Sequence, residues 1–166
     1  RELGEKGQLV QEAIDQRRVV PFFQPIRDSE GGAAIGHEVL SRIRTGSGKV
    51  LGAGEFIEHA ERMGVVHTLD FQVMEGAFAH AAAADYRGLL FINLSPRALV
   101  LTEFLTKTRE LVRGYGIAPS SVVFELTERD TVHNLGVLEQ FVRELKRDGF
   151  KFAVDDFGSG FSSFHY

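Results

Sequence analysis

The sequence predicts an α/β protein built on a mainly parallel sheet. Segments typical of strands alternate with segments typical of helices, a pattern that implies parallel strands joined by helical crossovers. Four of the predicted strands end in a polar residue. The chain has 166 residues, of which 43% are hydrophobic and 25% charged, and this suits one globular domain with a sizeable core.

The first elements are a helix and a hairpin. Apolar residues at helical spacing predict a helix over residues 4–18, which we interpret as a lead-in (1–18) from an upstream regulatory domain. Two β-rich segments at 19–26 and 34–40 flank a turn and are expected to pair as a hairpin. The glycine-rich stretch 46–54 is expected to be a loop.

The remaining elements follow from hydrophobic periodicity, glycine stops and a proline near a helix start. They are expected as helices at 55–63 and 66–84, a strand at 89–94, a helix at 96–113, a strand at 121–126, a helix at 131–147 and a strand at 152–155. The total is about five strands. A set of phenylalanines is interpreted as core packing, namely Phe22, Phe23, Phe71, Phe78, Phe91, Phe104 and Phe141.

The polar strand ends predict a functional site. They are Glu38, Asn93, Glu125 and Asp155, with Asp156 directly after the last. Because side chains alternate along a strand, the apolar neighbours of these ends fall on the opposite, helix-covered face; they are Val39, Leu94, Leu126 and Val154. Active sites of β/α barrels lie at this end of the strands, but open doubly wound sheets also bind ligands there, so the pattern leaves both architectures open.

Clustered carboxylates indicate a divalent cation, because ionised carboxylates repel one another unless a positive charge joins them. The chain has no cysteine, so oxygen ligands and hard cations such as Mg²⁺ or Mn²⁺ are favoured. Asp156 is placed to reach a second ion if the chain turns there, and Gly158 and Gly160 permit a turn. A two-metal site would suit phosphodiester cleavage.

Charge and hydropathy restrict the partners. A net charge of -4 gives no reason to expect a groove for a nucleic-acid polymer. No stretch is long and apolar enough for a transmembrane span or a signal peptide. We therefore expect a cytoplasmic protein, with any membrane anchor supplied by other domains of the parent protein.

Five segments resemble motifs of the EAL family of cyclic-di-GMP phosphodiesterases, in the family's order. They are QPI at 24–26, GHEVLSR at 36–42, NLS at 93–95, ELTE at 125–128 and DDFGSGFSS at 155–163. The resemblance covers residues 19–166 and implies a (β/α)₈ TIM-type barrel, incomplete here. It implies hydrolysis of cyclic-di-GMP to linear pGpG with Mg²⁺ or Mn²⁺.

The resemblance also implies roles for single residues. Metal binding falls to Glu38, Asn93, Glu125, Asp155 and Asp156, and the catalytic set is Glu38, Asp155, Asp156 and Glu128. In this interpretation Glu128 holds the loop 157–161, a loop linked in the family to homodimer formation. Gln24 and Arg42 contact substrate, the arginine through a phosphate. Family habit further suggests a GGDEF-type domain upstream.

Two departures qualify this interpretation. Val39 stands where the signature has alanine, and the family's catalytic lysine and later glutamate are not in this sequence. A closed barrel needs eight strands, so we expect the 166 residues alone to expose a sheet edge and to be inactive. By composition alone Glu128 is a helix cap or a partner of Arg129. A non-catalytic cyclic-di-GMP sensor and a purely structural module stay open as alternatives.

Overall fold

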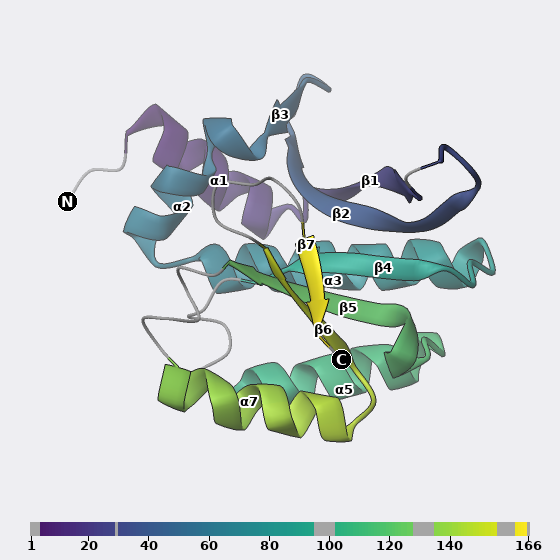
Figure 1. The fold of residues 1–166 in the computed structure, drawn as a ribbon. Helices are drawn as coiled ribbons and strands as arrows, with labels where there is room; N and C mark the ends of the chain where they lie inside the picture. Colours follow the sequence, from purple (N-terminus) through teal and green to yellow (C-terminus); the bar gives the residue numbers. More distant parts are fainter. Residues whose placement is uncertain (1–3, 29, 95–101, 128–134, 156–161, 166) are drawn as a thin grey trace.

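A mixed sheet with helices packed on one face carries the fold (Figure 1). The computed structural model describes residues 4–28, 30–94, 102–127, 135–155 and 162–165. The strands are β1 (Val19–Arg27), β2 (Ala34–Arg44), β3 (Val50–Gly52), β4 (Leu89–Asn93), β5 (Val122–Thr127), β6 (Lys151–Asp155) and β7 (Ser162–His165). The α-helices are α1 (Glu5–Asp15), α2 (Ile57–Met63), α3 (Val66–Ala83), α5 (Thr102–Tyr115) and α7 (Leu135–Arg147).

The strand pairing confirms the predicted fold class. β1 and β2 form an antiparallel hairpin, and β2, β4, β5 and β6 follow one another as parallel neighbours. The order β1-β2-β4-β5-β6-β7 does not close into a ring within the described residues. This is a partial parallel sheet with an antiparallel first strand, the arrangement of an incomplete TIM-type barrel.

Two strands were not predicted. The stretch 46–54 is not simply a loop, because β3 pairs with the end of β2 and a short 3₁₀ turn follows at Ala53–Glu55. The reversal is made by a tight turn in which the Thr45 N–H donates to the Lys49 carbonyl at 2.8 Å and Gly48 has a φ of 91°. At the other end β7 pairs antiparallel with β6, so the sheet has seven strands rather than five.

The helices agree with the periodicity where the structure describes them. α3 ends one residue before its expected limit, α7 ends at the expected Arg147, and α5 continues two residues beyond Arg113. The expected starts of the last two helices, near residues 96 and 131, lie outside the described residues. α1 is part of the same core, since Val10 and Ala13 are fully buried with residues of the sheet and of α3. No helix in the described part is both long and apolar enough to cross a membrane.

The core is divided by the sheet. The larger cluster lies between the sheet and the helices and includes Val39, Leu94 and Leu126. A smaller cluster of Phe91, Val123 and Ala153 lies on the other face, the face that would be the inside of a barrel.

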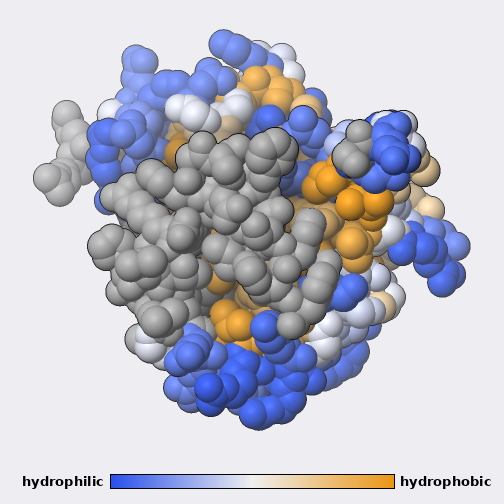
Figure 2. All heavy atoms as spheres, viewed as in Figure 1, coloured by the Kyte–Doolittle hydropathy of each residue, from blue (hydrophilic) through white to orange (hydrophobic). Residues whose placement is uncertain are grey.

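Two phenylalanines are exceptions to the predicted core. Phe22 and Phe23, both in the β1–β2 hairpin, are each 37% exposed. Phe22 lies beneath the Arg42 guanidinium, and Phe23 borders a cavity beside α3, so neither ring is fully enclosed. Ile35 on the same hairpin is also exposed, and hydrophobic residues gather at this part of the surface in Figure 2.

Candidate active site

Three neighbouring strands bring Glu38, Asn93 and Glu125 together. Of the three, only Asn93 ends its strand as predicted, because β2 continues beyond Glu38 to Arg44 and β5 continues two residues beyond Glu125. In the parallel register Glu38 pairs with Phe91, two residues before Asn93, and Asn93 pairs directly with Glu125. Residues paired in this way, and residues two apart on one strand, share a face of the sheet. The three polar side chains therefore lie on the inner face, as predicted.

The opposite face explains why the polar residues point inward. Val39, Leu94 and Leu126 each follow one of the three polar residues, and each is at most 6% exposed in the core beneath the helices. A shift of one residue would place three charged or polar groups in that core and three aliphatic ones in the site. Burial of the aliphatic neighbours thus fixes the orientation of the site.

A side-chain hydrogen bond joins two of the predicted ligands. Asn93 donates from Nδ2 to Oε2 of Glu38 at 3.1 Å. The amide oxygen of Asn93 is consequently the atom of this side chain that suits a cation. Glu125, beside Asn93, is only 7% exposed, and a buried carboxylate is costly unless a positive or hydrogen-donating group compensates it.

This donor set fits a hard divalent cation. Adjacent strands carry oxygen ligands of the kind that Mg²⁺ and Mn²⁺ prefer, namely the carboxylates of Glu38 and Glu125 and the amide oxygen of Asn93. Within the described part of the chain, no group of three histidine, aspartate or glutamate side chains is close enough to hold a metal ion. In this set the third ligand is instead an asparagine, Asn93, and the predicted ligand Asp156 lies outside the described residues.

The acidic loop is only partly described. Asp155 ends β6, where its Cα pairs with Thr127 of β5, two residues on from the pairing of Ala153 with Glu125. Its backbone therefore reaches the same end of the sheet as Glu125. Asp156, the loop 157–161 and Glu128 lie outside the described residues, so their predicted roles stay predictions.

The two predicted substrate-binding residues lie on the hairpin, on the same face as Glu38. Gln24 is the antiparallel partner of Glu38 and is exposed. Arg42 is four residues beyond Glu38 on β2, and its guanidinium lies 5.8 Å from the centroid of the Phe22 ring while donating to the Ser41 carbonyl at 2.8 Å. A cation–π contact of this kind keeps the guanidinium near the site with donors to spare.

A cavity beside the pair contains residues that the sequence interpretation missed. It has a volume of about 370 Å³, and its walls include Arg42 and Asn93 together with Glu61 of α2 and Asp70 of α3. The sequence feature that could have indicated it is the single acidic residue, Asp70, in the first half of α3. Only the packing of α3 against the sheet brings Asp70 to the same cavity as Arg42.

The chain is similar to known proteins over nearly all of its length. The family model of the EAL domain matches residues 8–166. The cyclic di-GMP phosphodiesterase PdeB of Shewanella oneidensis is 31% identical over 164 residues, which is 95% of this chain and 19% of that protein. The chain thus spans about a fifth of the length of this curated relative.

Two solved structures have the same fold. The PaMucR phosphodiesterase, in complex with c-di-GMP, has a TM-score of 0.84 at 22% identity, covering 96% of this chain and 66% of that one. The S helix-GGDEF-EAL structure of Vibrio cholerae LapD, bound to c-di-GMP, has a TM-score of 0.78 at 22% identity, covering 95% of this chain and 38% of that one. Together with the family match and the arrangement of Glu38, Asn93 and Glu125, these likenesses establish that the chain belongs to the EAL domain family.

Proposed function

We propose that this chain is part of a cyclic-di-GMP phosphodiesterase domain that hydrolyses one phosphodiester bond to give linear pGpG. The observation that carries the proposal is the hydrogen-bonded pair of Glu38 and Asn93 beside the buried Glu125, with Arg42 on the same face. It combines oxygen ligands for a cation with a guanidinium for a phosphate. The name of PdeB and the bound ligand of PaMucR support cyclic-di-GMP as the substrate.

In this proposal each predicted ligand has one task. Glu38, Asn93, Glu125 and Asp155 would hold one Mg²⁺ or Mn²⁺, and Asp156 a second. Metal ions in such a site lower the pKa of water and neutralise charge on a phosphodiester during cleavage. The Asn93 amide orients the Glu38 carboxylate through the 3.1 Å hydrogen bond.

The hairpin supplies the contacts with substrate. Arg42, held over Phe22, binds a phosphate oxygen through its remaining N–H groups, and Gln24 offers an amide at the outer edge of the site. Both residues are on one hairpin with Glu38, so the substrate is positioned directly against the metal ligands. Glu128 would hold the loop 157–161 in place.

The 166 residues alone are proposed to be inactive. Among the described residues the sheet does not close, and the family's lysine and later glutamate would have to come from further strands. A homodimer and an upstream GGDEF-type domain are also proposed, the latter supported by the GGDEF-EAL arrangement of LapD. α1 packs into the core of this domain, which makes it a rigid connection for such a partner.

The alternative is a cyclic-di-GMP sensor without catalysis. Val39, the departure from the family signature, is 3% exposed in the helix-side core, where it also lines the cavity beside the Glu38–Asn93 pair, and it does not lie on the inner face. The departure therefore leaves the inner face unchanged, and this favours the enzyme over the sensor.

The deciding experiment measures pGpG formation from cyclic-di-GMP by the full-length natural protein in Mg²⁺ or Mn²⁺. Glu38→Ala is the test variant, Glu58→Ala on the exposed face of α2 is the matched control, and the 166-residue chain is a further sample. We expect activity in the wild type and in Glu58→Ala, and none in Glu38→Ala or the isolated chain. Binding of cyclic-di-GMP without pGpG formation by the wild type would establish the sensor instead.

A further inference from the structure

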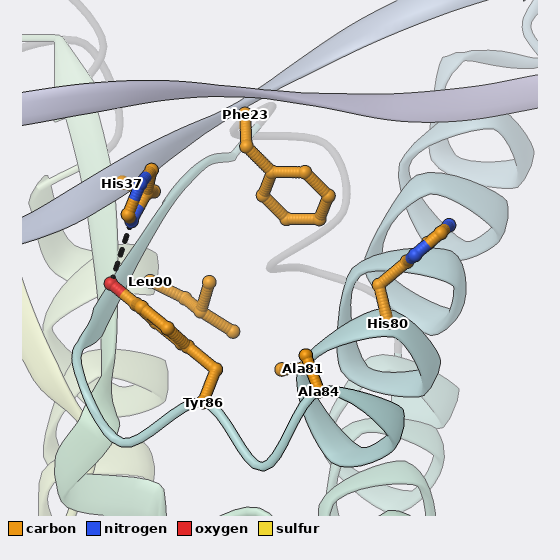
Figure 3. Close-up of a pocket in the computed structure, with 7 residues that line it drawn as sticks. All are labelled: Phe23, His37, His80, Ala81, Ala84, Tyr86 and Leu90. Carbon is orange, nitrogen blue, oxygen red and sulfur yellow. Dashed lines mark hydrogen bonds between the residues drawn. The ribbon is translucent and has the colours of Figure 1, made fainter.

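A tyrosine hydroxyl joins β2 and β4 on the face of the sheet opposite to the candidate site. The Tyr86 hydroxyl lies 2.8 Å from Nδ1 of His37 and donates to the Leu89 carbonyl at 3.0 Å. The two rings also meet edge to face, with centroids 5.2 Å apart and an interplanar angle of 74°. Figure 3 shows the His37–Tyr86 bond at the wall of a cavity between β2 and α3.

The hydrogen-bond directions follow from the single proton of a phenol. Because that proton is donated to Leu89, the oxygen of Tyr86 accepts, and Nδ1 of His37 must be the protonated donor. Burial raises the pKa of Tyr86 above its ordinary value of 10.0, so the hydroxyl keeps its proton at neutral pH. The chain of bonds is thus His37 to Tyr86 to the backbone of β4.

The backbone leaves room for this hydroxyl at one point. A Cβ on Gly88 would lie 2.6 Å from Cζ of Tyr86 and would overlap the hydroxyl itself. Any larger residue at position 88 would displace the ring. A glycine that precedes β4 therefore permits the tyrosine to reach both strands.

Steric packing by itself does not hold His37 in place. The cavity has a volume of about 290 Å³ and is lined by His37, Tyr86, Phe23, His80 and Leu90, among others. The imidazole therefore has open space on one side, and its hydrogen bond and its ring contact with Tyr86 are both contacts that orient it.

The same two strands carry the candidate metal ligands. His37 is the residue before Glu38 and pairs with Leu90 in the parallel register, while Asn93 ends the strand that Leu89 begins. In addition to the backbone pairing of β2 with β4, the Tyr86 hydroxyl joins the two strands on the helix side, and the Asn93–Glu38 hydrogen bond joins them on the inner side. A displacement of either strand would change the hydrogen bonds of Tyr86 and the Asn93–Glu38 hydrogen bond together.

We propose that Tyr86 is a positioning residue for the Glu38–Asn93 pair, acting through His37 and the Leu89 carbonyl. The expected effect on metal binding rests on the proposed function. The expected effect on the position of the Glu38–Asn93 pair does not. The rate of a catalysed reaction falls steeply when a catalytic group is misplaced by about 1 Å. The hydrogen bonds of Tyr86 between β2 and β4 can therefore affect the site that these strands carry. Partners behind metal ligands commonly change metal affinity by about 10- to 100-fold.

The test compares two tyrosine-to-phenylalanine variants of the full-length natural protein. Tyr86→Phe removes the hydroxyl between the strands. Tyr115→Phe removes the hydroxyl that donates to Glu75 Oε2 at 3.2 Å, a bond between α5 and α3 that involves neither β2 nor β4, and so controls for the loss of a tyrosine hydrogen bond. Two readouts are taken: the side-chain amide signal of Asn93 by NMR of the metal-free protein, and the affinity for Mn²⁺. Asn93→Asp identifies the signal by its disappearance.

We expect Tyr86→Phe to shift the Asn93 signal and to weaken Mn²⁺ binding about tenfold, with Tyr115→Phe like wild type in both readouts. His37→Asn, whose amide places a donor near the position of Nδ1, should restore most of what His37→Leu loses. Equal Asn93 signals in the two phenylalanine variants would overturn the proposal, as would unchanged Mn²⁺ affinity in Tyr86→Phe. Absence of Mn²⁺ binding in the wild type would remove the proposed function, while the NMR readout would still decide the positioning role.

Discussion

Asn93 of β4 donates a hydrogen bond of 3.1 Å to Glu38 of β2, a residue 55 positions earlier in the chain. The bond joins a neutral amide to a carboxylate, with Glu125 on the next strand. An amide at this position therefore separates two acidic residues while offering its own oxygen to a cation.

Replacing Asn93 should reveal whether the site is a centre of negative charge. Asn93→Asp places a third carboxylate between Glu38 and Glu125, whereas Asn93→Ala only removes the hydrogen bond. In the presence of a chelator we expect Asn93→Asp to lower the free energy of unfolding by about 1–3 kcal/mol, and by more than Asn93→Ala does. Urea unfolding with a chelator and then with Mn²⁺ measures this, and Mn²⁺ should return the aspartate variant toward wild type. Equal stabilities of the two variants in chelator would contradict a negatively charged site.

Arg42 should be sensitive even to a conservative change. Its guanidinium lies over Phe22 and on the face of Glu38, whereas the side chain of Arg44 at the end of β2 is exposed. A lysine cannot reproduce the bidentate, stacked geometry. We expect Arg42→Lys to weaken binding of cyclic-di-GMP about tenfold and Arg44→Lys to change it less than twofold, as measured by isothermal titration. Equal affinities in the two lysine variants would remove Arg42 from the substrate site.

Gly36 should tolerate no side chain. A Cβ at this position would lie 2.7 Å from the Leu89 carbonyl oxygen and 3.0 Å from the Phe91 ring, on the inner face between β2 and β4. We expect Gly36→Ala to lower the free energy of unfolding by about 1–3 kcal/mol.

The matched control for this glycine is in α5. Nothing lies within 4 Å of a Cβ at Gly114, so Gly114→Ala should stabilise the protein by about 0.5–1 kcal/mol through helix propensity. Chemical denaturation of both variants checks the pair. A stable Gly36→Ala protein would mean that β2 and β4 are further apart than described.

The partly buried phenol of Tyr86 should make the stability of the protein fall in alkali. Burial raises its pKa above 10.0 in the folded protein, so the folded state holds this proton more tightly than the unfolded chain does. The contribution is complete below the unfolded pKa and is lost as the pH rises through the folded one. We expect Tyr86→Phe to have a shallower decline of stability above about pH 10 than wild type. Parallel unfolding curves of the two proteins against pH would argue against burial as the cause.

The sequence was sufficient for those features that depend on local periodicity. Strand–helix alternation predicted the parallel sheet, and the alternation of polar and aliphatic residues at strand ends placed Glu38, Asn93 and Glu125 on one face. By the same local rule, His37, the residue before Glu38, lies on the other face. These predictions succeed because the side-chain period of a strand is fixed by its backbone geometry.

Other features depend on which segments pack together. Phe22 and Phe23 read as core by hydrophobicity, but the hairpin leaves them partly exposed, and β3 and β7 form only because chain reversals bring them beside β2 and β6. Asp70 reaches the site through the packing of α3. Tyr86 contacts a residue 49 positions away, and no local pattern in the sequence encodes that meeting. The sequence by itself thus determined which face each strand residue takes, because that is a property of neighbouring residues, whereas tertiary packing alone decided which distant side chains share hydrogen bonds.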